Sequence, residues 1–224
     1  MIIYNPQNEN ILKGKIEEAE SLLNQISAKH CFITGSFLYK ENYKDIDIFV
    51  ISRSKKRFQV RNKKAKITII DFNELYSLFY HSISKSCIAK NILPQKPLKI
   101  TLADYWGIIN EAVPMLLNQK NTYHKSVRYL LLYTHYFLNE QTLDTFQLNK
   151  RVLEFKSYQE VLDYIFQNIQ KVFVKYGKPS YIKRFFYTQS GYYLKLSGYQ
   201  AQNYLYDLTH QIIRGLSHGR YSEI

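Results

Sequence analysis

Two aspartates stand one residue apart in an apolar run, "DIDIFVI", which covers residues 45–51. The faces of a strand alternate with a period of two, so Asp45 and Asp47 are expected to project to one side and Ile46 and Ile48 to the other. Two carboxylates this close repel each other unless a cation lies between them. Mg²⁺ prefers oxygen ligands and commonly uses one or two carboxylates together with substrate phosphates. The pair therefore predicts a magnesium site.

A glycine and a serine precede this pair at a predicted strand-to-helix turn. Gly35 and Ser36 follow the apolar run "CFIT", and eight residues separate them from Asp45. Glycine lets the backbone approach a ligand closely, and the N–H groups at a helix start attract anions. A phosphate-binding turn beside a metal-binding strand predicts a site for a nucleoside triphosphate (NTP) with Mg²⁺.

In these residues the sequence resembles the nucleotidyltransferase superfamily, whose fold is shared by DNA polymerase beta, poly(A) polymerases, antibiotic nucleotidyltransferases and some bacterial toxin or antitoxin proteins. The resemblance covers residues 31–72: "FITGS", eight residues, and then "DIDIFVI". It implies an enzyme that transfers a nucleoside monophosphate from an NTP to an acceptor hydroxyl and releases pyrophosphate. It also implies that Asp45 and Asp47 bridge two Mg²⁺ ions, while Gly35 and Ser36 hold the departing pyrophosphate.

The family has a third carboxylate on a later strand, and the resemblance implies that Asp71, in "KITIIDF", is this metal ligand or accepts the proton of the acceptor. Two structural alternatives stay open. Asp71 and Glu74 also have the spacing of a helix N-cap with a capping box. Asp45 can instead be a turn residue after "ENYK", which would leave Asp47 as a charge at the edge of a strand.

Cationic contacts to the triphosphate usually come from the helical second domain in this family. In "YHKSVRYLLLYTHYF", Lys125 and Arg128 lie three residues apart and share a helix face, so they are our candidates for nucleotide binding. A solvated helix face is the alternative. The histidines show no metal-ligand spacing, which argues against a zinc site.

The acceptor is inferred from charge. The formal net charge is +13, and residues 53–66 carry eight Lys or Arg and no acid. Such a segment is either a solvated loop or a polyanion-binding surface. We favour RNA, and tRNA in particular, as the acceptor, with an antitoxin or toxin protein as a further partner. The alternatives are a small-molecule acceptor of the antibiotic type and a non-catalytic antitoxin or RNA-binding module of the same fold.

The predicted elements have an α+β order. A helix is predicted over residues 8–29, strands over "CFIT", "DIDIFVI" and "KITII" with a short helical stretch "SFLYKEN" between the first two, and a helix over "FNELYSLFYHSI". Pro94 and Pro97 indicate a linker. We therefore expect a small mixed-sheet nucleotidyltransferase core in residues 1–98 with flanking helices, and a mainly helical domain in residues 99–224.

Within that second domain we expect helices opened by Thr101, Asn121 and Ser157, a helix stop at Gly177 and a last helix over residues 198–214. Residues 181–196 read as either a hairpin or a broken helix. The two cysteines have no Cys-x-x-Cys spacing and indicate reduced thiols, and no leader or membrane-spanning run is visible. A cytoplasmic, soluble protein is expected.

Overall fold

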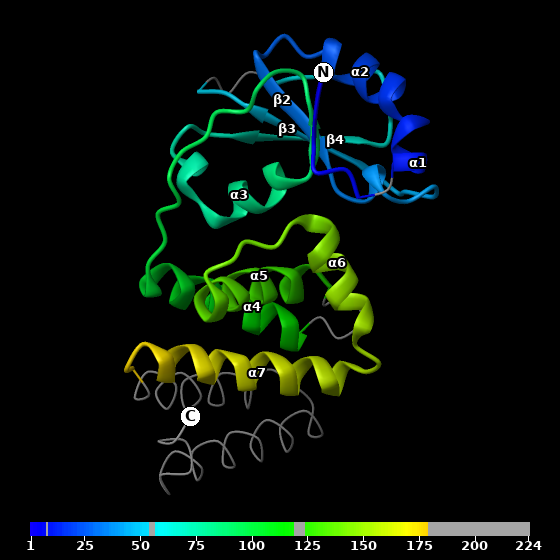
Figure 1. Ribbon diagram of the computed structural model, residues 1–224. Helices are drawn as coiled ribbons and strands as arrows, with labels where there is room; N and C mark the ends of the chain where they lie inside the picture. The colour runs from blue at the N-terminus through cyan, green and yellow to red at the C-terminus, as the bar shows by residue number, and fades with distance from the viewer. Residues whose placement is uncertain (8, 54–56, 119–123, 179–224) are drawn as a thin grey trace, which may run out of the picture. The chain divides into compact units, whose positions relative to one another are not determined.

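The computed structural model of the chain describes residues 1–7, 9–53, 57–118 and 124–178. Within these residues, five strands form one sheet, and β3 (Ile46–Ile51) and β4 (Ala65–Ile70) run parallel while the other neighbours are antiparallel. The fold is mixed α and β, as predicted. The strands lie across the sheet in the order β1 (Ile2–Tyr4), β5 (Cys87–Ala89), β2 (His30–Thr34), β3 (Ile46–Ile51) and β4 (Ala65–Ile70), of which β2, β3 and β4 are labelled in Figure 1.

The same described residues hold seven α-helices and two short 3₁₀-helices. These are α1 (Glu9–Lys13), α2 (Ile16–Asn24), η1 (Ser36–Leu38), η2 (Glu74–Tyr76), α3 (Leu78–Lys85), α4 (Leu102–Asn118), α5 (His124–Asn139), α6 (Thr145–Glu154) and α7 (Tyr158–Lys175). After the predicted linker only helices follow in this part of the chain, which agrees with the predicted change of character.

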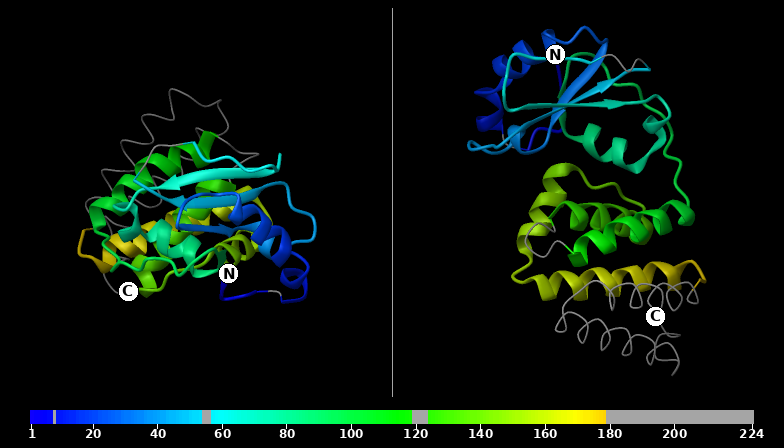
Figure 2. Two further views of the ribbon diagram at one scale, coloured as in Figure 1. Left: turned by 90° about the horizontal axis from the view of Figure 1, so that it is seen from above. Right: turned by 180° about the vertical axis from the view of Figure 1, so that it is seen from behind.

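Both faces of the sheet are covered, because consecutive residues of β2 and β3 are apolar and each face of these strands is therefore apolar. Ile48 and Val50 of β3 belong to one buried cluster with Leu22 and Leu23 of α2. Phe49, on the opposite side of β3, belongs to a second buried cluster that includes residues of α3. Figure 2 shows the result, with α1 and α2 on one side of the sheet and α3 on the other.

The helix predicted over residues 8–29 is two helices. α1 ends at Lys13 and α2 begins at Ile16, with Lys15 as its N-cap residue. The apolar positions run through the break at helical spacing, so the pattern gave no sign of it. Lys15, which lies between the two helices, donates from its side chain to the backbone carbonyls of Phe37 and Lys40. The break therefore places this side chain against the segment that follows Gly35.

Three further elements were not predicted from sequence. β1 and β5 have three residues each, too few for alternation to be recognised. α6 is opened by a capping box in which the buried Asp144 accepts from the Gln147 N–H at 2.8 Å. The predicted caps at Thr101 and Ser157 and the stop at Gly177, with φ of 64°, are confirmed.

The chain folds as two compact units that alternate along the sequence. Among the described residues, the first unit comprises those up to 108 and 131–155, and the second comprises 109–118, 124–130 and 156–178. The domain boundary at residue 98 stays a prediction. The predicted cap at Asn121, the predicted helix over residues 198–214 and the segment 181–196 lie outside the described residues. No helix among the described residues is both long enough and apolar enough to cross a membrane.

The two cysteine thiols are expected to resist thiol reagents in the folded protein. Cys31 and Cys87 are buried, and burial raises the pKa of Cys31 to about 11 and also raises that of Cys87. At pH 8 the Cys31 thiolate should be roughly a hundredfold rarer than in an exposed cysteine. Labelling by an aromatic disulfide reagent, with and without urea, measures this, and fast labelling of the native chain would contradict it.

The same raised pKa predicts how stability depends on pH. A thiol with a folded-state pKa of about 11 and an ordinary value of 9.0 contributes stability that is fully present below about pH 9. That contribution is lost as the pH rises through about 11. Urea unfolding between pH 8 and 11 should therefore show a falling free energy of unfolding, and a Cys31→Ala variant should show a smaller fall.

Candidate active site at the start of β3

The glycine of the predicted turn lies against one of the two aspartates. Thr34, at the end of β2, is the cross-strand partner of Asp47, and Gly35 follows it with φ 84° and ψ −159°. A side-chain carbon added to Gly35 would lie 2.9 Å from Asp47 Oδ2. Only glycine adopts this backbone conformation readily, and only glycine leaves room for the carboxylate.

Asp45 and Asp47 lie on one side of the sheet at the start of β3, because Lys66, the partner of Asp47, also pairs with Asp45. Asp47 is the second residue of β3 and Asp45 directly precedes the strand, while the intervening Ile46 is fully buried in the cluster beneath α2. Both carboxylates are half-buried. β3 lies between β2 and β4, so Asp47 is not at an edge of the sheet.

Lys66 is a third charged residue at this point, and it was missed by the sequence analysis. It pairs with Asp47 in the parallel register of β3 and β4, and its ammonium forms an ion pair with Asp45 Oδ2. The pKa of Lys66 is raised, first by the hydrogen bond to Asp45 and then by the attraction of the negative charges of Asp45 and Asp47. The alternation of β4 could have shown which face Lys66 takes, but not which residue of β3 it stands beside.

The segment between Ser36 and Lys44 is fixed by hydrogen bonds and ring contacts from Lys15, the N-cap of α2, and from Glu18 in its first turn. Lys15 Nζ donates to the Phe37 carbonyl at 2.9 Å and lies 4.4 Å from the centre of the Tyr43 ring. The Tyr43 hydroxyl donates to Glu18 Oε2 at 3.1 Å. These contacts connect the turn at Gly35 to the start of β3, so the two parts of the motif keep their relative positions.

α6 supports the same end of β2. The Thr34 hydroxyl donates to the Ser86 carbonyl at 2.8 Å and lies 3.3 Å from the Thr145 hydroxyl, in the first turn of α6. The ring of Tyr39 packs edge-on against that of Phe146, with 5.1 Å between ring centres. The site therefore depends on residues more than a hundred positions apart, which no local motif contains.

Asp71 does not join the pair. In the parallel register Asp47 stands beside Lys66, whereas Asp71 follows Ile70, the partner of Ile51 at the other end of β3. Asp71 lies five positions after Lys66, which amounts to roughly 16 Å along an extended strand. Asp71 instead shapes a turn: its side chain accepts from the Asn73 N–H at 2.9 Å, and its own N–H donates to Glu74 Oε2 at 2.6 Å. The capping alternative is therefore met only in part, because Glu74 accepts from the Asp71 N–H but the N-cap residue of η2 is Asn73, and the position beside the pair belongs to Lys66.

Lys125 and Arg128 lie in the first turns of α5, in the second compact unit. Lys125 is exposed and Arg128 is half-buried. They are not among the residues that the fold of the first unit brings to Asp45 and Asp47, and their role in nucleotide binding stays a prediction.

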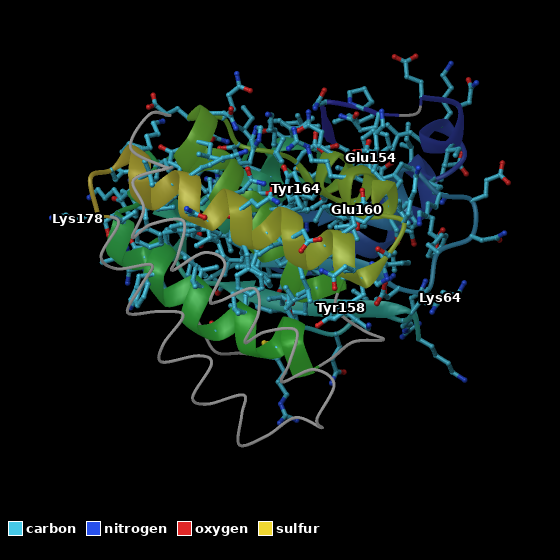
Figure 3. All side chains as sticks on the ribbon, turned by 90° about the horizontal axis from the view of Figure 1, so that it is seen from below. Lys64, Glu154, Tyr158, Glu160, Tyr164 and Lys178 are labelled. Atoms are coloured by element: carbon cyan, nitrogen blue, oxygen red, sulfur yellow. The ribbon has the colours of Figure 1, made fainter. Side chains whose placement is uncertain are left out.

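Residues 53–66, referred to below as the basic segment, are anchored by apolar side chains, and the charged side chains among the described residues point outward. Phe58 and Val60 pack against the cluster beneath α2, and the backbone N–H of Arg61 donates to Gln25 Oε1 at 2.7 Å. A hollow of about 600 Å³ is lined here by Gln25, Gln59, Val60 and Arg61. Among the described residues of this segment, the exposed basic ones are Arg53, Arg57, Arg61, Lys63, Lys64 and Lys66 (Lys64 is labelled in Figure 3).

The donors at this site suit a hard divalent cation. Asp45 and Asp47 offer carboxylate oxygens, and the missing side chain of Gly35 leaves space beside Asp47 Oδ2. Within the described residues, no group of three or more His, Cys, Asp or Glu side chains could hold a metal. Any ion here would therefore depend on the two aspartates and on ligands from substrate or water.

Comparisons of the chain with protein-family models, with curated proteins and with solved structures find no match.

Proposed function

We propose that this protein is a Mg²⁺-dependent nucleotidyltransferase. The observation that carries the proposal is the contact of the Gly35 turn with Asp47, because it joins the two halves of the Gly-Ser and Asp-x-Asp motif at a single point. Further support comes from the common face of Asp45 and Asp47 and from the mixed sheet that holds them.

Asp45 and Asp47 would hold the metal in this proposal. Bound Mg²⁺ supplies neutralisation of phosphate charge and polarisation of the phosphoryl oxygens. Gly35 keeps the space beside Asp47 open, and Ser36 offers a hydroxyl and a backbone N–H at the same turn. Asp71 has no part in the proposal, because it lies at the other end of β3 and β4.

The reaction joins the acceptor oxygen to the α-phosphorus of the NTP. The bond from the α-phosphorus to the bridging oxygen breaks, pyrophosphate leaves, and the acceptor hydroxyl releases its proton to solvent water. The side chains contribute position and charge, which are the main sources of rate in phosphoryl-type transfer.

RNA, with tRNA as the first candidate, is the proposed acceptor. The exposed basic residues that precede and begin β4 offer phosphate contacts close in sequence to Lys66. A small-molecule acceptor remains the alternative, and a toxin or antitoxin protein is the proposed partner in the cell.

One observation favours a second candidate function, a non-catalytic module that binds nucleotide or RNA. The place beside Asp47 on β4 is taken by a lysine, and Asp71, the candidate third carboxylate, lies at the other end of the two strands. The ion pair between Lys66 and Asp45 balances one of the two negative charges without any metal.

A transfer assay separates these candidates. The protein is incubated with Mg²⁺, each α-labelled NTP in turn and bulk tRNA. Label on RNA, absent when EDTA is added, is expected. Mg²⁺-dependent thermal stabilisation by an NTP without transfer to RNA would point to another acceptor. If the protein shows no transfer to RNA and no stabilisation by any NTP, the enzymatic proposal is overturned.

Neutralising the basic segment should weaken RNA binding and make it less sensitive to salt. In the variant Arg57→Gln/Arg61→Gln/Lys63→Gln, each lost phosphate contact should reduce the slope of log affinity against log salt by about 1. Fluorescence anisotropy with labelled tRNA at several salt concentrations measures this slope. A slope equal to that of the wild type would assign this segment to a solvated loop.

A further inference from the structure

Lys66 brings a built-in positive charge to the proposed metal site. Its backbone lies beside Asp47, its ammonium pairs with Asp45, and all three side chains belong to one face of β3 and β4. The strands that carry them are neighbours in the sheet (Figure 1). The three side chains together have a formal charge of −1, where the two aspartates alone would have −2.

We propose that the Lys66 ammonium takes the place of the second metal ion, so that the site holds one divalent cation. This inference rests on the proposed function, because it concerns the metal bound by Asp45 and Asp47.

The argument is one of charge and ligands. Two-metal sites hold their ions ~3.5–4 Å apart, and their mutual repulsion must be offset by carboxylates placed between and around them. Here one oxygen of Asp45 already accepts from an ammonium, and the described residues contain no third carboxylate at this point. A second dication would have to displace Lys66 from Asp45 while depending on only two protein carboxylates.

The position of Lys66 also allows its ammonium to supply positive charge at the site after substrate binds. Two-thirds of its side chain is exposed, so its ammonium can turn from Asp45 toward a phosphate oxygen without moving the strand. A lysine that replaces one ion in this way would keep the total positive charge around the phosphates lower than in a two-metal site.

Mn²⁺ titration of the full-length protein, followed by the EPR signal of free Mn²⁺, tests this inference. We expect one bound ion per chain, lost in Asp47→Asn. Lys66→Asp should bind two ions, and Lys66→Gln should bind its single ion about two- to fivefold more tightly, as expected from an exposed ion pair.

Lys29→Asp is the matched control, because Lys29 is exposed and precedes the opposite end of β2, so its charge change should leave the ion count unaltered. Circular dichroism of every variant checks folding. Two ions in the wild type would overturn the inference and leave the proposed function standing. A Lys66→Asp variant that is folded and still binds one ion would also overturn it. No bound ion in the wild type would instead overturn the metal site on which both proposals depend.

Discussion

Replacing Asp47 by asparagine is expected to reduce nucleotidyl transfer by at least about a thousandfold and to leave the protein folded. Asparagine keeps the size of the side chain beside Gly35 but removes the negative charge that would hold the cation. The half-buried position and the relief of repulsion from Asp45 predict little change in stability. Transfer of label from an α-labelled NTP measures the first effect, and thermal unfolding followed by circular dichroism measures the second.

Asp71→Asn is the matched control. It makes the same chemical change at the other end of β3 and β4, so transfer should stay within a fewfold of the wild type. Full activity of Asp47→Asn would refute the assignment of the metal site. A loss of transfer in Asp71→Asn as large as that in Asp47→Asn would restore Asp71 to the site, against its position in the structure.

Replacing Gly35 by alanine is expected to reduce both stability and metal binding. The backbone conformation of Gly35, with φ 84° and ψ −159°, is one that residues with a side chain almost never adopt, and strain of this kind costs about 1–3 kcal/mol. The new carbon would also meet Asp47 Oδ2 at 2.9 Å, so either the carboxylate or the turn must move. Urea unfolding and Mn²⁺ binding measure the two effects separately.

Two other glycines serve as controls for this variant. Gly177→Ala introduces a side chain at a positive φ but meets nothing within 4 Å, so it should lower stability without affecting Mn²⁺ binding. Gly14→Ala meets only the Ile11 carbonyl oxygen at 3.8 Å, an ordinary contact, and should change neither property. Normal Mn²⁺ binding by Gly35→Ala would show that the close approach to Asp47 does not matter for the metal.

Much of the first unit could be predicted from the sequence, because its signals are local. Alternation in "DIDIFVI" predicted the strand, which begins at Ile46, and the predicted common side of Asp45 and Asp47 agrees with the ion pair between Asp45 and Lys66, the partner of Asp47. Gly35 was singled out as a turn residue where the backbone approaches a ligand, and it does lie at a turn with positive φ. The capping residues Thr101 and Ser157 were equally readable, since a cap involves residues only three apart.

Asp71 shows where local reasoning stopped. Its place directly after a predicted strand was known, but the direction of that strand relative to β3 was not. In a parallel pair, the residue after β4 lies at the end of β3 opposite to Asp45. Had the pair been antiparallel, the same residue would have come near the start of β3. Strand direction depends on how the intervening chain crosses over, and the sequence pattern of a strand is the same for both directions.

Lys66 and Thr145 show what only the tertiary structure decided. The sequence by itself determined that β3 carries two carboxylates on one face and that a glycine turn precedes it. It could not show that a lysine of β4 stands beside Asp47, because strand register is set by packing across the whole sheet. Nor could it show that α6, more than a hundred residues later, would place Thr145 beside Thr34. Which residues share a face with a carboxylate along its own strand is decided by the geometry of a few residues. Which residues of other strands and helices lie beside it is decided by how the whole core is buried.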